Sequence, residues 1–133
     1  MVLYFTGTGN SRFVAERIAS SVGDKAENIS TYIKGNSKPR FTDTGVYVFV
    51  APCYVSTTAM AMFDFIMSAS FPEGVRAYFV ITSASYMGAA PATNRYLAKK
   101  KGFEYMVVPH ARHVQILVLS FFQCANPIIR HAH

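Results

Sequence analysis

The sequence predicts an α/β fold, a doubly wound sheet of five parallel strands in the order 2-1-3-4-5 with helices on both faces. Strand-like and helix-like stretches alternate along the chain, and residues 46–51 and 77–81 are apolar at consecutive positions. Such unbroken runs are typical of parallel strands covered on both sides, and right-handed crossovers place helices on the two faces. Because 133 residues with 51% hydrophobic content can bury one core and hardly two, we expect a single domain over 1–133.

The first half of the chain supplies two strands and the first helix. Residues 1–5 form a short apolar run suited to a buried strand. The helix that follows has an apolar face at helical spacing, made of Val14, Ala15, Ile18, Ala19 and Val22. Residues 26–33 are expected to form the second strand. Residues 34–43, rich in Gly, Pro, Ser and Lys, predict a loop with little room for a helix.

The second half supplies the centre of the sheet, with strands expected at 46–51 and 77–81. Between them a helix is expected to pack through Met60, Phe63, Ile66 and Met67. A helix over 91–101 begins with a proline, ends in lysines that suit the negative end of its dipole, and is followed by Gly102 as a left-handed cap. A doubly wound sheet also needs a fifth helix, which residues 111–126 are expected to form on the face covered by the first helix.

The strongest functional signal lies between the first strand and the first helix. At such a junction, free backbone N–H groups and the positive end of the helix dipole favour an anion. Two glycines let the backbone curl into a concave nest, and hydroxyl and amide side chains add donors. The loop consists of Thr6, Gly7, Thr8, Gly9, Asn10 and Ser11. Because it contains no charged side chain, the loop suits a phosphomonoester.

Two better-known phosphate loops fit less well. A Walker loop ends in Gly-Lys-Ser/Thr, whereas here Asn10 and Ser11 follow Gly9, so no lysine reaches a terminal phosphate. A dinucleotide fingerprint needs a third glycine where this chain has Arg12, and an acidic residue near the end of the second strand, where it offers Thr31. Nucleoside triphosphate hydrolysis and tight NAD binding are therefore not expected. The remaining alternative is a turn that binds nothing.

The octet at residues 4–11, Tyr-Phe-Thr-Gly-Thr-Gly-Asn-Ser, resembles the FMN-phosphate loop of flavodoxins. After the third strand, Pro52-Cys53-Tyr54 is similar to the Pro-x-Tyr of the flavodoxin half of flavodoxin-ferredoxin fusion proteins. The resemblance covers residues 1–109 and implies a flavodoxin-like fold with FMN as cofactor. Residues 110–133 resemble nothing in that family, and the clustered cysteines of a ferredoxin module are lacking.

The resemblance also implies where the rest of the cofactor site lies. In doubly wound sheets, ligands bind beyond the carboxyl ends of the strands where the winding reverses, here between the first and third strands. A third wall follows the fourth strand, and Tyr54 and Tyr86 are implied to flank the isoalloxazine ring by stacking. The two walls are expected to contribute Pro52, Cys53, Tyr54, Val55, Ser83, Ala84, Ser85, Tyr86 and Gly88.

The charge balance departs from the family, which is typically acidic. The chain has a net charge of +6 and a pI near 9.5, so we expect a redox partner with an acidic surface, such as a ferredoxin-like module, steered by long-range attraction. The basic residues are dispersed without an arginine-aromatic motif, which disfavours nucleic acid as a partner. No apolar run approaches the ~20 residues needed to cross a bilayer, so no membrane association is expected.

Cellular location and metal content follow from few residues. The polar stretch 6–12 interrupts the apolar start, so a secretory signal is not predicted. Cys53 and Cys124 are too few for a disulfide framework or an iron-sulfur cluster, and both are expected to be reduced thiols in a cytoplasmic protein. His110 and His113 could approach each other on one helical turn, but no carboxylate lies near them, and we expect no metal site.

Three functional hypotheses remain open. The first is an FMN-binding electron carrier, the second an NAD(P)H-dependent quinone or flavin reductase, and the third a flavin-free binding protein or shortened relic of a larger redox protein. Residues 114–122 are apolar on nearly all sides of a helix. This segment is therefore expected to be deeply buried, to pair with another chain as in a homodimer, or to be an aggregation liability.

Overall fold

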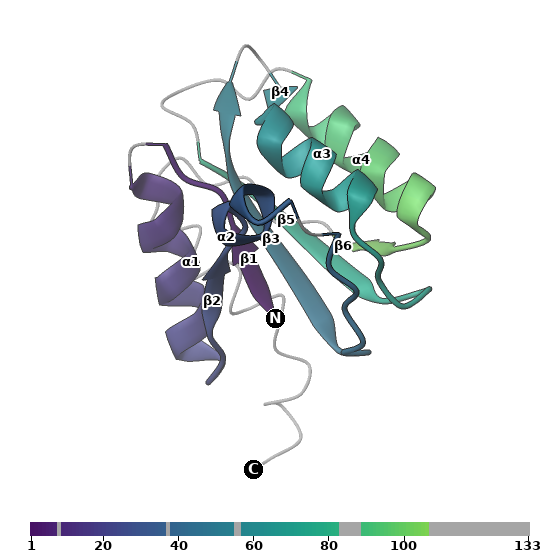
Figure 1. Cartoon of the computed structure of the whole chain (residues 1–133), viewed down its shortest axis with the longest axis horizontal. Coiled ribbons are helices and arrows are strands. Elements are labelled where there is room, and N and C mark those ends of the chain that lie inside the picture. The colour runs from purple at the N-terminus through teal and green to yellow at the C-terminus, as the bar shows by residue number, and fades with distance from the viewer. Residues whose placement is uncertain (8, 37, 55–56, 83–88, 107–133) are drawn as a thin grey trace.

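Five parallel strands form the sheet of this protein in the order β2-β1-β3-β5-β6, which is the predicted 2-1-3-4-5 arrangement (Figure 1). The computed structural model describes residues 1–7, 9–36, 38–54, 57–82 and 89–106. The strands are β1 (Val2–Tyr4), β2 (Ala26–Asn28), β3 (Val46–Tyr54), β5 (Arg76–Thr82) and β6 (Glu104–Met106). A short strand that the sequence did not predict, β4 (Thr57–Thr58), pairs antiparallel with the end of β3.

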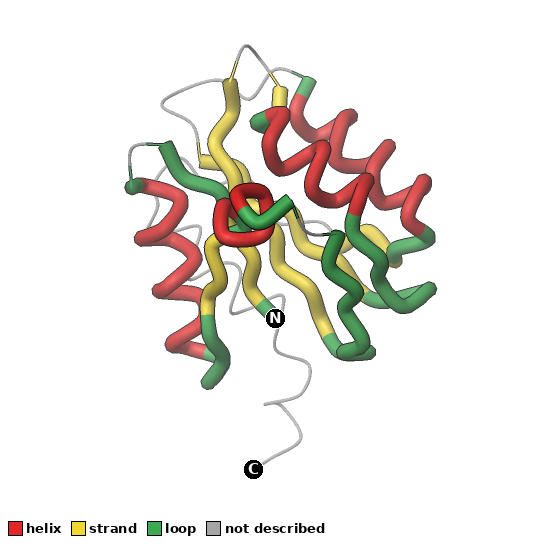
Figure 2. The backbone as a smooth tube through the Cα atoms, viewed as in Figure 1, coloured by secondary structure: helices red, strands yellow, loops and turns green. Residues whose placement is uncertain are grey.

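Helices cover the sheet on both faces (Figures 1 and 2). Helix α1 (Asn10–Ser21) packs on one face, and α3 (Met60–Ser68) and α4 (Ala90–Lys101) pack on the other, together with the short α2 (Ser30–Lys34). Side chains of β3 alternate between the two cores: Tyr47 and Phe49 face α3 and α4, whereas Val48 faces α1. The sheet is therefore buried on both sides, as its continuous apolar strands predicted.

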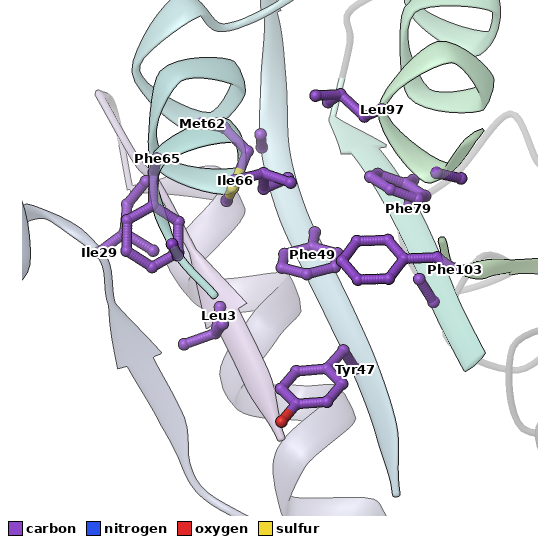
Figure 3. Packing of buried hydrophobic residues seen from close by; sticks show 14 of the residues in the cluster. Leu3, Ile29, Tyr47, Phe49, Met62, Phe65, Ile66, Phe79, Leu97 and Phe103 are labelled. Carbon is purple, nitrogen blue, oxygen red and sulfur yellow. The ribbon is translucent and has the colours of Figure 1, made fainter. Parts of the chain in front are cut away.

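Aromatic rings dominate the core beneath α3 and α4. The rings of Phe49 and Phe103 lie 5.8 Å apart at the centre of this core (Figure 3). The Tyr47 ring lies in the same core, and its hydroxyl donates to the backbone oxygen of Asp43 at 2.6 Å. Because a buried hydroxyl without a partner is costly, this bond lets a tyrosine occupy a core position.

The predicted second strand is too long, and the helix in its second half was not expected. The strand ends at Asn28, whose side-chain oxygen accepts the N–H of Ser30 at 2.9 Å. The Thr31 hydroxyl donates to the backbone oxygen of Asn28 at 2.9 Å, and α2 begins there. Asparagine turns the chain in this way because its side chain replaces a backbone partner. Ile29 still fills the core, and its N–H donates to the Tyr4 oxygen of β1.

Helix α3 packs through a different face from the one predicted. It buries Met62, Phe65 and Ile66, whereas Met60 and Met67 are 59% and 41% exposed. The helix carries apolar residues at almost every position, so the spacing alone fits more than one face. Ile66 belongs to both the predicted and the observed face, and the predicted Phe63 is partly buried against the same core.

Helix α4 agrees with the prediction. A proline lies in its first turn, its last turn holds three lysines, and Gly102 follows as a left-handed cap with a φ of 70°. Lys101 donates to the backbone oxygen of Ala69 at 2.7 Å and so ties the end of α4 to the end of α3. The fifth helix predicted at 111–126 lies outside the described residues. Within the described ranges, no helix is long and apolar enough to span a bilayer.

Candidate functional site

The loop singled out by the sequence lies where the winding of the sheet reverses. β1 and β3 are parallel neighbours, α1 follows β1 on one face, and α3 follows β3 and β4 on the other (Figure 1). Beyond β1, the Phe5 N–H donates to the Val50 oxygen at 3.0 Å, which keeps the chain beside β3 as the loop begins. The carboxyl edge of these two strands is the place where doubly wound folds hold ligands.

Gly9 gives the loop its shape. Its φ is +99°, and it immediately precedes the first residue of α1. The Gly9 N–H donates to the Thr6 hydroxyl at 2.8 Å, and the Gly9 oxygen accepts the Phe13 N–H at 3.0 Å. A Cβ at this position would meet no heavy atom within 4 Å, so space is open beside the backbone. The loop is closed by its own hydrogen bonds and still leaves room at the helix N-terminus.

The electrostatics of this end of α1 favour an anion. No acidic residue lies in the first helical turn, and the first N–H groups of a helix have no partner within the helix. Arg12 lies on the exposed surface, where its Nε donates to the Glu16 carboxylate at 2.9 Å. This bond raises the pKa of the Arg12 guanidinium. The Arg12 guanidinium is thus paired with Glu16 on the same helix. The groups of the loop that can donate hydrogen bonds to an anion are backbone N–H groups and side-chain hydroxyls.

Ser11 connects the loop to a second strand end. Its side chain is only 2% exposed, and its hydroxyl lies 2.8 Å from the hydroxyl of Thr82, the last residue of β5. Thr82 is in turn the register partner of Pro52 in β3. The structure therefore brings together the carboxyl ends of β1, β3 and β5. The sequence predicted Ser11 but missed Thr82, although a polar residue at the end of an apolar strand was a signal.

The second predicted wall is a strand rather than a loop. Pro52, Cys53 and Tyr54 are the last residues of β3, and Cys53 and Tyr54 pair with Thr58 and Thr57 of β4. The Pro52 oxygen accepts the Ala59 N–H at 3.0 Å. Burial raises the pKa of the half-buried Cys53 thiol, which therefore stays protonated and is a weak nucleophile.

A buried polar pair supports this wall from behind. The Thr58 hydroxyl donates to the Asn94 side-chain oxygen at 2.8 Å, and both residues are buried. The pair joins β4 to the first half of α4. Sequence reasoning missed this pair because its two residues lie 36 positions apart and polar side chains are not expected in the core.

Part of the predicted site lies outside the described residues. Residues outside the described ranges are Thr8, Val55, Ser83, Ala84, Ser85, Tyr86 and Gly88, and of Tyr54 only the backbone is described. Thr6, Gly7 and Gly9 lie in the loop, and Asn10 and Ser11 are the first residues of α1. Ser11 reaches the end of β5 beside Pro52. Among the described residues, no three His, Cys, Asp or Glu side chains gather where they could hold a metal ion.

Comparisons with known proteins agree on the fold. The sequence matches no protein-family model and no curated protein. A flavodoxin from the domain Archaea superposes with a TM-score of 0.58 at 14% identity, over 98% of this chain and 97% of that one. An oxidoreductase from Corynebacterium diphtheriae gives 0.62 at 12% identity, over 93% and 92%. A putative flavoprotein from Bacteroides eggerthii gives 0.59 at 14% identity, over 93% and 96%. The chain has a flavodoxin-like fold.

Proposed function

We propose that this chain binds FMN and transfers electrons in the manner of a flavodoxin. The observation that carries the proposal is an uncharged, hydroxyl-bearing loop at the N-terminus of α1. This loop lies where the winding of a flavodoxin-like sheet reverses, between β1 and β3. Proteins that share this fold and are named as a flavodoxin and a putative flavoprotein support flavin as the ligand class. The resemblance to the flavodoxin half of flavodoxin-ferredoxin fusion proteins in particular has no support from these comparisons.

The donors of the loop fit a phosphate group. The Thr6 oxygen accepts the Gly9 N–H, which leaves the Thr6 proton available for donation to an anion. The open space at Gly9 lets a phosphate oxygen approach the backbone, as it does at other helix N-termini. A phosphate held in this way needs no lysine or arginine, because backbone N–H groups and the helix dipole supply the positive potential.

The walls of the site have a different role from the loop. When bound, FMN supplies the one- and two-electron chemistry, and the protein sets its orientation and its access to solvent. We propose that Tyr54 and Tyr86 flank the flavin ring and that residues 83–88 close the third side. The protonated Cys53 thiol lies at the second wall, where it contributes packing rather than covalent chemistry.

Titration with FMN and riboflavin tests this proposal. FMN should bind much more tightly than riboflavin, because charge-assisted hydrogen bonds to the phosphate contribute roughly 1.5–3 kcal/mol each. Thr8→Ala should weaken FMN binding and leave riboflavin binding nearly unchanged. Equal losses of affinity for FMN and riboflavin in this variant contradict the assignment of the phosphate loop. If the unaltered chain binds neither flavin, the result supports the alternative of a flavin-free binding protein or relic. Rapid NAD(P)H consumption with quinone or free flavin identifies the reductase alternative.

We also propose an acidic redox partner in the cytoplasm, docked on the outer surface of α3 and α4. This α3–α4 surface comprises Met60, Phe63, Met67, Tyr96 and Lys100. The rings of Phe63 and Tyr96 stack with centroids 6.4 Å apart, and the Lys100 ammonium lies 5.6 Å from the centre of the Tyr96 ring. Met60, Met67 and Tyr96 are exposed, whereas Phe63 is partly buried against the core. Exposed methionine and aromatic side chains favour protein contacts, and the lysines of α4 favour an acidic partner.

The apolar segment 114–122 supports a further proposal, a homodimer formed through this part of the chain. Light scattering of the full chain measures its mass in solution. A dimer that becomes a monomer on Leu117→Lys supports the proposal, and a monomeric full chain contradicts it.

A further inference from the structure

Ser11 and Thr82 form a hydroxyl pair between the first turn of α1 and the end of β5. Thr82 ends β5, where the backbone pairing with Pro52 of β3 proceeds without any help from the Thr82 side chain. The Thr82 hydroxyl nevertheless lies 2.8 Å from the Ser11 hydroxyl, in the first turn of α1. This bond links the phosphate loop to the strand that leads into the third wall of the proposed flavin site.

The direction of the bond determines what the loop can donate. Each hydroxyl has one proton, and either oxygen can be the donor in the structure. If Ser11 donates to Thr82, the Ser11 proton is used within the protein. If Thr82 donates to Ser11, the Ser11 proton is left to donate to an anion held by the loop, and the two bonds in sequence strengthen each other.

We infer that Thr82 is a positioning residue for the phosphate of the cofactor. It donates its proton to the Ser11 oxygen, and so directs the Ser11 proton to a phosphomonoester at the N-terminus of α1. This inference rests on the proposed binding of FMN. It predicts that Thr82, on a strand separate from the loop, contributes to selectivity for the phosphorylated flavin.

The test compares FMN and riboflavin affinities of Thr82→Val, Thr82→Ser, Ser11→Ala and the double variant Ser11→Ala/Thr82→Val, by quenching of flavin fluorescence. Thr82→Val should weaken FMN binding about fivefold, the loss of one hydrogen bond, and change riboflavin binding by less than about twofold. Thr82→Ser keeps the hydroxyl and should bind FMN as the unaltered chain does. In the Ser11→Ala background, Thr82→Val should have no further effect on FMN, because no Ser11 proton remains to be directed.

Ser68→Ala is the matched control. Its hydroxyl donates to the Phe65 oxygen at 3.0 Å near the end of α3, at the opposite edge of the sheet from the loop. This variant loses a hydroxyl bond of similar length and should bind both flavins normally. Thermal unfolding without flavin shows whether each variant is folded. If Thr82→Val does not fold, Ser11→Ala decides: a loss confined to FMN supports the inference, and an equal loss of both flavins overturns it.

The outcomes separate this inference from the proposed function. An unaltered chain that binds neither flavin overturns both. The unaltered chain can prefer FMN while Thr82→Val either binds FMN equally well or loses affinity for FMN and riboflavin to the same extent. That outcome overturns only the role of Thr82. A fivefold loss that persists in the Ser11→Ala background also overturns it, since Thr82 then acts without Ser11.

Discussion

Gly9 is the residue on which the shape of the phosphate loop depends most directly. Its φ of +99° is costly for any residue with a Cβ, whereas the open space around it means that an added methyl group would meet no neighbour. The cost of substitution is therefore conformational and local. The loop can relieve it by moving away from the shape that it has in this structure.

We therefore expect Gly9→Ala to weaken FMN binding about tenfold, corresponding to roughly 1–2 kcal/mol of backbone strain. Gly23→Ala is the matched control, because Gly23 has a φ of +68° and open space at the other end of α1. Both variants should lower the free energy of unfolding in urea by similar amounts. Only Gly9→Ala should change the FMN affinity. A similar loss of FMN affinity in Gly23→Ala would mean that the substitutions weaken binding by destabilising the fold, and not by changing the shape of the loop.

Tyr32 offers a test of the electrostatics that does not depend on any ligand. Its hydroxyl donates to the Glu27 carboxylate at 2.6 Å, which, with burial, raises the pKa of Tyr32 from 10.0 to about 12. Because the folded pKa lies above the unfolded one, this pair stabilises the fold below pH ~10 and its contribution is lost as the pH rises through about 12. Glu27→Ala should lower the pKa of Tyr32 toward its ordinary value, as measured by NMR titration of the ring. An unchanged pKa would show that burial, and not the carboxylate, causes the shift.

At the scale of elements, the sequence predicted the strands and helices better than the contacts that orient them. Continuous apolar runs rich in β-branched and aromatic residues identified β3 and β5, since strands buried on both faces have such runs. The packed face of α3 was predicted wrongly, because a helix that is apolar nearly all round has no unique periodicity. The bonds Ser11–Thr82 and Thr58–Asn94 join residues 71 and 36 positions apart, and no local pattern indicates such pairs.

The charge on α4 leads to a prediction about partner association. Lys99→Glu/Lys100→Glu should slow electron transfer from the reduced protein to an acidic [2Fe–2S] ferredoxin about tenfold at low ionic strength, because steering by charge is lost. The rate of the variant should also depend less on salt. Stopped-flow absorbance measures both quantities. The control is Lys25→Glu/Lys34→Glu, which makes the same change in net charge on exposed residues away from α4. Equal slowing in the two variants would show that net charge matters and the α3–α4 surface does not.

At the scale of the whole molecule, the two faces of the sheet differ in how the described helices cover them. On one face, α3 and α4 lie over the aromatic core, with Phe49 and Phe103 between them and the sheet (Figure 3). On the other face, α1 packs mainly against β1, β2 and β3. Tyr78 and Val80 of β5 are nonetheless 4% and 3% exposed on that face.

The sequence assigns residues 111–126 to a fifth helix on this same face, and removal of the C-terminal segment tests that assignment. A chain that ends at residue 110 should lose the cover of the part of this face that α1 does not reach, and at about 25 cal/mol per Å² the lost burial amounts to several kcal/mol. Since a domain of this size has a total stability of about 5–15 kcal/mol, the fragment should be insoluble or should lose cooperative unfolding and bind a hydrophobic dye.

A point variant, Leu117→Asp, should lower the unfolding midpoint in the full chain if that residue is buried against the sheet. The opposite result is a soluble 1–110 fragment that unfolds cooperatively and still binds FMN. It would show that residues 1–110 form the complete folding unit. The apolar C-terminal segment would then serve another purpose, such as pairing two copies.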